Sequence, residues 1–300
     1  MFRDIRHLVP QGSLPQDFPA STRRGFHDSI DFRPATRASA QTIESGDLKA
    51  MIPVLVLGDS HASVFSSEKI TALLPGYSFE VTSVGGATVS GLQNPNAVTQ
   101  AMPQFTSALE KTAATTVIVM LGEVDTGFVI WYRAQKYGTP VSQMLQLAVD
   151  NYQKLLKDIA LTHQVICIST PLPTIRDGMD WGEVANLRKE VKATLAERTL
   201  LTKKFNDLME RYCISEGISH LNFDSHSTDD WGNLKESLRN PDPSDHHYDP
   251  SAHALLIEPL LAPLLERLHF HPDHYRAPSA QPVAKQTVRE RLLNFIQRWK

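Results

Sequence analysis

The tripeptide Gly58-Asp59-Ser60 carries a hydroxyl group at a position where a hydroxyl can act as a nucleophile. It directly follows the apolar run Val54–Leu57, which predicts a buried parallel strand ending in a sharp turn. Residues 61–65 then predict the first turn of a helix. A serine there lies where open α/β sheets bind ligands, and its backbone N–H faces any anion that forms. The alternative is a plain helix cap, because Asp and Ser are both favoured N-cap residues.

A second glycine-containing segment, residues 84–91, follows the next predicted strand, residues 79–83. With these two segments the chain resembles the SGNH, or GDSL-type, hydrolases. The resemblance implies that Ser60 is the nucleophile and that the backbone N–H of Gly86 belongs to an oxyanion hole. A glycine suits that role because no side chain obstructs the approach of the substrate to the N–H group.

The third segment departs from the family pattern. A buried strand predicted at 115–121 runs into Gly122–Asp125, where the family has Gly-x-Asn-Asp, so Val124 stands where the family has an asparagine donor. Losing one such donor typically costs about a hundred- to a thousandfold in turnover. Glu123 and Asp125 place two carboxylates beside the expected site, with Arg133 as a cation that could pair with one of them. Alternatively, Asp125 binds loop backbone and Glu123 serves an ion pair.

The fourth region is a polar stretch just before the last predicted helix. The family has its catalytic histidine there, with an aspartate three residues earlier, and alignment on the helix start selects His247. The residue three positions earlier is Ser244, so the acid that orients the imidazole would be Asp245 or Asp242. Either could serve, because a triad is defined by geometry rather than by spacing. His246 stays open as an alternative base.

Strand and helix patterns alternate along the middle of the chain, which predicts a parallel sheet covered on both faces. With right-handed crossovers this gives a three-layer α/β/α, flavodoxin-like fold with five strands in the order 2-1-3-4-5. The predicted strands are residues 53–58, 79–83, 115–121, 164–169 and 219–223. Helical periodicity is clear in 141–161, 186–216 and 252–268.

Composition excludes several classes of protein. The formal net charge of -3 gives no broad basic surface, so no nucleic-acid partner is expected. The two cysteines, Cys167 and Cys213, are too few for a disulfide framework and are expected to be buried free thiols. No apolar run is long enough for a transmembrane helix and no secretory signal is recognisable, so we expect a cytoplasmic protein. No organic cofactor is implied, and the histidines show no recognised zinc spacing.

Three regions are expected along the chain: a polar N-terminal extension (1–50), the hydrolase-like domain (51–270) and a linker with a C-terminal amphipathic helix (271–300). Apolar residues of Val288–Lys300 recur at helical spacing between basic residues. So short a helix needs a partner surface. That surface could be its own domain, another subunit or a membrane.

The functional prediction is a serine esterase that acts on an acyl ester through an acyl-Ser60 intermediate. The resemblance favours a small-molecule or glycan-linked ester, because many members of the family act on such substrates. Transfer of the acyl group to a second hydroxyl would use the same residues. The alternatives are a non-catalytic protein that binds a glycan or acyl ligand in the same crevice, or an interaction module. A hydrolase would turn over an ester through Ser60, whereas a binding protein would bind the ligand without turnover.

Overall fold

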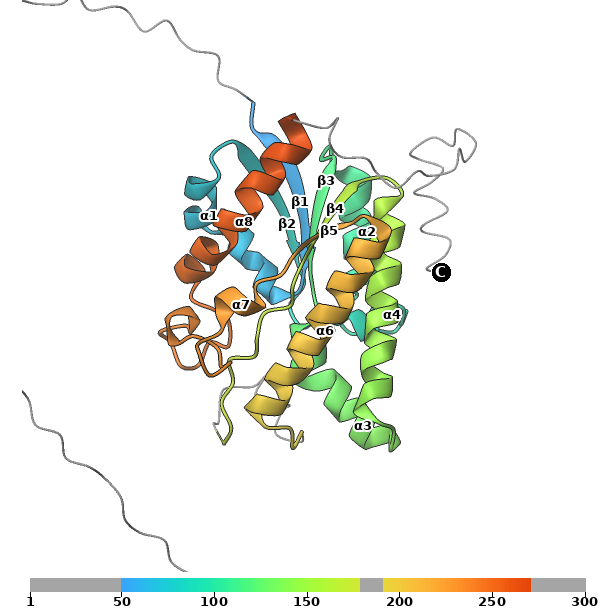
Figure 1. Ribbon diagram of the computed structural model, residues 1–300. Helices are drawn as coiled ribbons and strands as arrows, with labels where there is room; N and C mark the ends of the chain where they lie inside the picture. Colours follow the sequence, from blue (N-terminus) through green and yellow to red (C-terminus); the bar gives the residue numbers. More distant parts are fainter. Residues whose placement is uncertain (1–49, 179–190, 271–300) are drawn as a thin grey trace, which may run out of the picture. The chain divides into compact units, whose positions relative to one another are not determined.

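The computed structural model describes residues 50–178 and 191–270, and they form an α/β domain around one parallel sheet (Figure 1). Its strand order is β2-β1-β3-β4-β5, and every neighbouring pair is parallel. This confirms the predicted fold class and strand order. The strands are β1 (Ile52–Gly58), β2 (Tyr77–Ser83), β3 (Thr116–Met120), β4 (Gln164–Ile168) and β5 (Ser219–Leu221).

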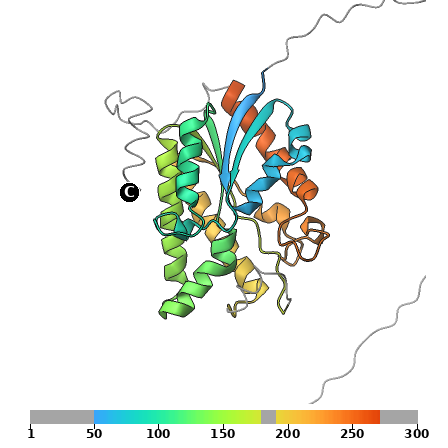
Figure 2. The ribbon, with the colours of Figure 1, turned by 180° about the vertical axis from the view of Figure 1, so that it is seen from behind.

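Helices cover both faces of this sheet, as Figures 1 and 2 show. One face packs against α1 (Glu68–Leu73) and α8 (Pro250–Phe270). The other packs against α2 (Ala101–Lys111), α4 (Val141–Ala160) and α6 (Leu195–Glu216). The central strands are therefore buried on both sides, which explains why β1 and β3 are continuous apolar runs rather than alternating ones.

The shorter helices lie in the connections. They are η1 (Ser60–Ser66), η2 (Val89–Gly91), the π-helix η3 (Asp125–Val129), α3 (Ile130–Tyr137), α7 (Asp224–Ser227) and η4 (Glu236–Leu238). The helical turn predicted after Ser60 is present as the 3-10 helix η1.

The helix predicted for residues 186–216 begins later than its periodicity indicates. The described residues 191–194 are not helical, and α6 starts at Leu195. Thr194 forms a reciprocal capping box with Glu197, in which each side chain binds the other residue's backbone N–H. The capping box satisfies N–H groups that have no partner within the helix, and it therefore fixes the start. Residues 186–190 lie outside the described part of the chain.

Three further predictions concern the cysteines, membrane-spanning helices and the terminal segments. Cys167 and Cys213 are free and buried, as expected. In the described part of the chain, no helix is long and apolar enough to cross a bilayer. The predicted N-terminal extension up to residue 49 and the amphipathic segment Val288–Lys300 lie outside the described residues.

Candidate active site

Ser60 lies at the carboxyl end of β1, on the first turn of η1. The preceding residue, Asp59, is fully buried and caps η1 by accepting a hydrogen bond from the backbone N–H of His61. Gly58 makes the sharp turn possible, because a Cβ there would lie 2.4 Å from the Met120 carbonyl oxygen. The side chain of Ser83 donates to the Asp59 carbonyl. Neighbouring strand ends on both sides of β1 thus fix the direction in which Ser60 points.

His247 contacts this serine from a loop 187 residues further along the chain. The distance between His247 Nε2 and Ser60 Oγ is 2.8 Å. On the other side of the ring, His247 Nδ1 lies 2.6 Å from Asp245 Oδ1. Because an ionised carboxylate only accepts hydrogen bonds, this network assigns the ring proton to Nδ1 and leaves Nε2 to accept from the Ser60 hydroxyl. The three side chains have the connectivity of a nucleophile, a base and an orienting acid.

Asp245 approaches His247 although it is only two residues earlier. Its Oδ1 also accepts a hydrogen bond from the His247 backbone N–H at 2.9 Å, so one turn aligns both groups. Its Oδ2 accepts from the side chain of Asn240 at 3.0 Å. Burial opposes ionisation of Asp245, but the hydrogen bonds from His247 outweigh it and lower the pKa of the carboxyl. The acid therefore stays charged opposite the imidazole.

Asp242, the other acid considered, is exposed and caps its own turn. It accepts hydrogen bonds from the backbone N–H and the hydroxyl of Ser244, and these lower its pKa. His246, the alternative base, is half-buried, with its ring centroid 4.1 Å from that of His247 and the two rings tilted by 37°. In this arrangement His247, rather than His246, forms the hydrogen bond to the serine hydroxyl.

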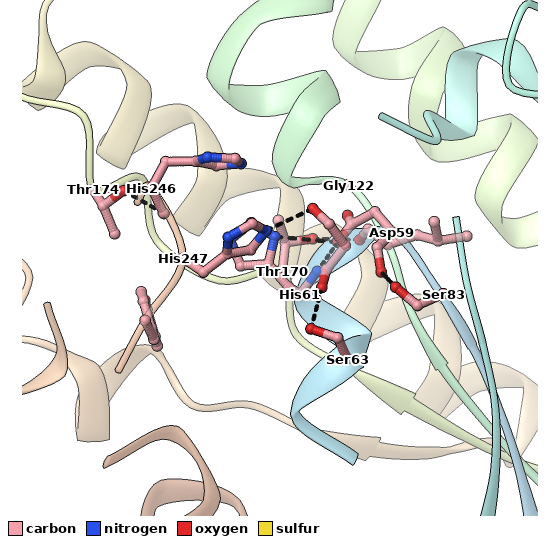
Figure 3. Close-up of polar contacts among 12 residues, drawn as sticks. Asp59, His61, Ser63, Ser83, Gly122, Thr170, Thr174, His246 and His247 are labelled. Atoms are coloured by element: carbon pink, nitrogen blue, oxygen red, sulfur yellow. Dashed lines mark hydrogen bonds and ion pairs between the residues drawn. The ribbon is translucent and has the colours of Figure 1, made fainter. Parts of the chain in front are cut away.

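The loop that carries His247 is pinned to the connection after β4. The hydroxyl of the fully buried Tyr248 accepts a hydrogen bond from the Leu172 backbone N–H at 2.8 Å. The Thr174 hydroxyl donates to the His246 carbonyl oxygen (Figure 3). Sequence reasoning missed these positioning contacts, because nothing in the spacing of these residues indicates that the two loops meet.

Gly86 lies on the loop that follows β2, with φ +71°, a backbone conformation that favours glycine. Asp125 holds this loop. Its two carboxylate oxygens accept hydrogen bonds from the backbone N–H groups of Val89 and Ser90, at 2.8 and 3.0 Å. Asp125 is fully buried, so it acts on the loop and does not face the crevice. This is the backbone-binding alternative considered above.

The environment of Asp125 also shifts the pKa of its carboxyl group. Burial raises its pKa to about 6, against the opposing hydrogen bonds of Ser90 and Val89 and the positive charge of Arg133. Arg133 is half-buried, and its positive charge lowers the pKa of Asp125. Glu123 is buried; burial is the main cause that raises the pKa of Tyr248, and the charge of Glu123 adds to it.

At the end of β3, the backbone of Gly122 has φ +118°, and a Cβ there would lie 2.6 Å from the Thr170 hydroxyl. This position therefore requires glycine. Val124, two residues later, is half-buried with helical backbone angles. Its side chain has no hydrogen-bond donor, so an oxyanion donor equivalent to asparagine is missing at this position.

A further histidine, His61, lies close to His246 and His247. It is 3 % exposed, and its Nδ1 lies 3.2 Å from Asp59 Oδ1. Its ring centroid is 4.7 Å from that of His247 and 5.9 Å from that of His246 (Figure 3). The signal that could have indicated it is the sequence Asp-x-His, which occurs at Asp59, Asp224 and Asp245.

A cavity of about 230 Å³ opens beside the imidazole of His247. Asp245, His61 and His253 line it together with three hydroxyl groups from η1 and its C-cap, those of Ser63, Ser66 and Ser67. Burial, followed by the positive charges that His61 and His247 can carry, lowers the pKa of His253 to about 3. The wall of this cavity therefore combines hydroxyl and imidazole groups with the apolar side chains of Val64 and Pro250, and His253 is neutral there.

Comparison with known proteins gives similarity at the level of structure only. No family model matches the chain, and no curated protein matches its sequence. Among solved structures, a GDSL-like lipase from Bacteroides thetaiotaomicron aligns with 13 % identity and a TM-score of 0.49, covering 72 % of this chain and 88 % of that one. The carbohydrate acetylesterase Est24 from Sinorhizobium meliloti aligns with 15 % identity and a TM-score of 0.49, covering 71 % and 99 %.

Alignments with such low identities and TM-scores say nothing about function. The function proposed below therefore rests on the arrangement of Ser60, His247 and Asp245. The solved structures with which the chain aligns include SGNH and GDSL-like hydrolases, and this likeness concerns the fold.

Proposed function

We propose that this protein is a serine hydrolase that cleaves an acyl ester. The single observation that carries the proposal is the continuous hydrogen-bond path from Ser60 through His247 to Asp245, with distances of 2.8 and 2.6 Å. A hydroxyl next to an oriented, neutral imidazole is the arrangement that activates a weak nucleophile.

In the proposed reaction, Ser60 Oγ attacks the acyl carbonyl carbon while its proton passes to His247 Nε2. The backbone N–H groups of Ser60 and Gly86 stabilise the negative charge on the carbonyl oxygen. The bond to the alcohol then breaks, and the alcohol leaves with the proton from His247. Water, deprotonated by the same imidazole, attacks the acyl-serine and releases the carboxylic acid.

The substrate class proposed is a short acyl ester, for example one carried on a sugar. The cavity beside His247 is small and has hydroxyl and imidazole groups in its wall, which suits a short acyl group or a polar alcohol better than a long alkyl chain. A matched series of acetyl, butyryl and octanoyl aryl esters tests this. We expect kcat/KM to fall with chain length, and a preference for the octanoyl ester would contradict the proposal.

The second candidate function is a ligand-binding protein without turnover, and Val124 is the observation that favours it. One assay separates the two functions. We expect the purified chain to hydrolyse 4-nitrophenyl acetate and the Ser60→Ala variant to lose that activity. The matched control is Ser215→Ala, the same change at an exposed position near the end of α6 and outside the cavity, which should keep turnover within about threefold. Equal rates in the wild type and Ser60→Ala would remove Ser60 from the reaction, and a wild-type rate no higher than that without protein would leave only the binding function.

A further inference from the structure

The loop that carries the proposed base also places three metal-binding groups together. Asp245, His246 and His247 each offer one ligand atom, and these atoms lie within 4.8 Å of one another. The imidazole centroids of His246 and His247 are 4.1 Å apart. Within residues 50–178 and 191–270, no other group of three His, Cys, Asp or Glu side chains meets this spacing.

The chemistry of this group suits a zinc ion. Zinc binds imidazole nitrogens and carboxylate oxygens at about 2.0–2.2 Å in tetrahedral geometry, so its ligand atoms lie about 3–3.5 Å from one another. Since 4.8 Å is the upper limit of the separations here, side-chain rotations that move an atom by about 1–2 Å bring the three groups into range. A water molecule can supply the fourth ligand, as in other three-ligand zinc sites.

The backbone of the loop is fixed before any ion arrives. The side chain of Asn240 binds Asp245 Oδ2, and Thr174 binds the carbonyl oxygen of His246. The next residue, Tyr248, is fully buried with its hydroxyl bound to the backbone of the β4 loop. Little conformational freedom of the backbone is therefore lost when an ion binds, which favours binding.

An ion can also reach the group. Asp245, His246 and His247 are all half-buried, and the 230 Å³ cavity opens on Asp245 and His247. The hydroxyl groups of Ser63, Ser66 and Ser67 in the wall of this cavity can hydrogen-bond to water molecules that the ion retains.

We propose that Asp245, His246 and His247 form a site for a divalent transition-metal ion, zinc above all, that competes with catalysis. His247 has two ring nitrogens, one facing Ser60 and the other facing Asp245. A metal ion bound to either nitrogen replaces one of the two hydrogen bonds on which the proposed triad depends. Metal binding and transfer of the serine proton therefore exclude each other. The competition part rests on the proposed hydrolase activity, whereas the metal site itself does not.

Equilibrium dialysis of the full, untagged chain against zinc chloride tests the site. We expect one zinc ion per wild-type chain and an affinity at least tenfold lower in both His246→Asn and His246→Gln, each checked for folding by circular dichroism. His226→Asn is the matched control, because His226 is an exposed histidine on α7, and it should bind zinc like the wild type. Equal affinity in all four proteins, or no binding by the wild type, overturns the site.

Ester hydrolysis in the presence of zinc tests the competition. Relative to its own metal-free rate, the wild type and His226→Asn should lose more than 90 % of turnover at saturating zinc and recover it with EDTA. The His246 variants should need at least tenfold more zinc for the same inhibition. Zinc that binds at this site without slowing hydrolysis overturns the competition. If the chain shows no ester hydrolysis at all, the dialysis result still decides the site, so the two failures remain distinguishable.

Discussion

The Asp245–His247 pair shows how a local turn can replace the spacing on which a family motif is based. In the motif the aspartate lies three residues before the histidine, whereas Asp245 lies only two residues before His247. Asp245 compensates by binding both the backbone N–H and the ring of His247 through one oxygen. Asp59 and His61 repeat this arrangement next to it, with the His61 ring centroid 4.7 Å from that of His247. Two aspartate–histidine pairs therefore lie side by side near Ser60.

Exchanging the two acids considered for the triad should give very different results. Asp245→Asn is expected to lower kcat by about a thousandfold or more, because an amide leaves the imidazole in the wrong tautomer. Asp242→Asn, which only weakens an exposed turn, should stay within about tenfold of the wild type. Initial rates of both variants on an aryl acetate give the comparison. The opposite ranking would transfer the orienting role to Asp242.

Val124 is the residue at which the proposed hydrolase lacks a donor. Val124→Asn should raise turnover if the missing amide limits the rate, since one oxyanion donor contributes up to about 3–4 kcal/mol of transition-state stabilisation. A poorly placed amide would recover less and could cost about 1–3 kcal/mol of stability if left without partners. Turnover and melting temperature should be measured on the same preparation. Lower turnover in a variant that melts like the wild type would indicate that valine belongs to a different site design.

At the scale of elements, strand ends and short helices bring the site together. The β1–η1 turn presents Ser60, the loop after β2 presents Gly86, and the loop before α8 presents His247. Asp125, at the start of η3, holds the β2 loop through two backbone N–H groups. Burial disfavours the charged form of the Asp125 carboxyl and raises its pKa to about 6.

This raised pKa predicts a dependence of stability on pH. The pKa of Asp125 is raised above its ordinary value of 3.8, so its stabilising contribution is complete below about pH 4 and falls as the pH rises through about 6. The shift corresponds to about 3 kcal/mol. The difference in free energy of unfolding between the wild type and Asp125→Asn should therefore shrink by up to that amount between pH 4 and pH 7.5. Urea unfolding of both proteins across this range measures it, and a difference that grows with pH would contradict the assignment.

The helices and strands show which features the sequence patterns predicted and which they did not. The strands β1, β3 and β4 were predictable because buried parallel strands are short apolar runs between turns, and all three have that form. The start of α6 was not, because hydrophobic periodicity continues across Thr194 and the capping box there is a local hydrogen-bond feature. Ser60 and Gly86 were predicted as site residues from their motifs. The choice of Asp245 over Asp242 depended on loop geometry that spacing does not specify.

At the scale of the whole molecule, the strand order explains why distant segments share one site. With β1 between β2 and β3, the carboxyl ends of all three meet where Ser60 lies. The loop before α8 then reaches the same end, at His247. Within the described part of the chain, the strands β1 to β5 and the residues of the proposed triad lie between positions 52 and 247.

A shortened chain tests whether this region is sufficient. The described domain begins at residue 50 and its first strand at Ile52, so a protein beginning at Leu48 should keep turnover within about twofold and a similar melting temperature. A protein beginning at Ser60, which lacks the central strand β1, should fail to fold. Loss of folding in the first protein would show that residues 1–47 are needed for the fold.

The most direct measurement of the central claim is covalent labelling of Ser60. A fluorophosphonate reacts with a serine only when a neighbouring base activates it, and the adduct survives mass spectrometry of tryptic peptides. We predict one adduct per chain, on Ser60, and at least a hundredfold slower labelling in His247→Gln, in a fold that circular dichroism shows to be unchanged. No adduct, or an adduct on another serine that persists in Ser60→Ala, would contradict the account.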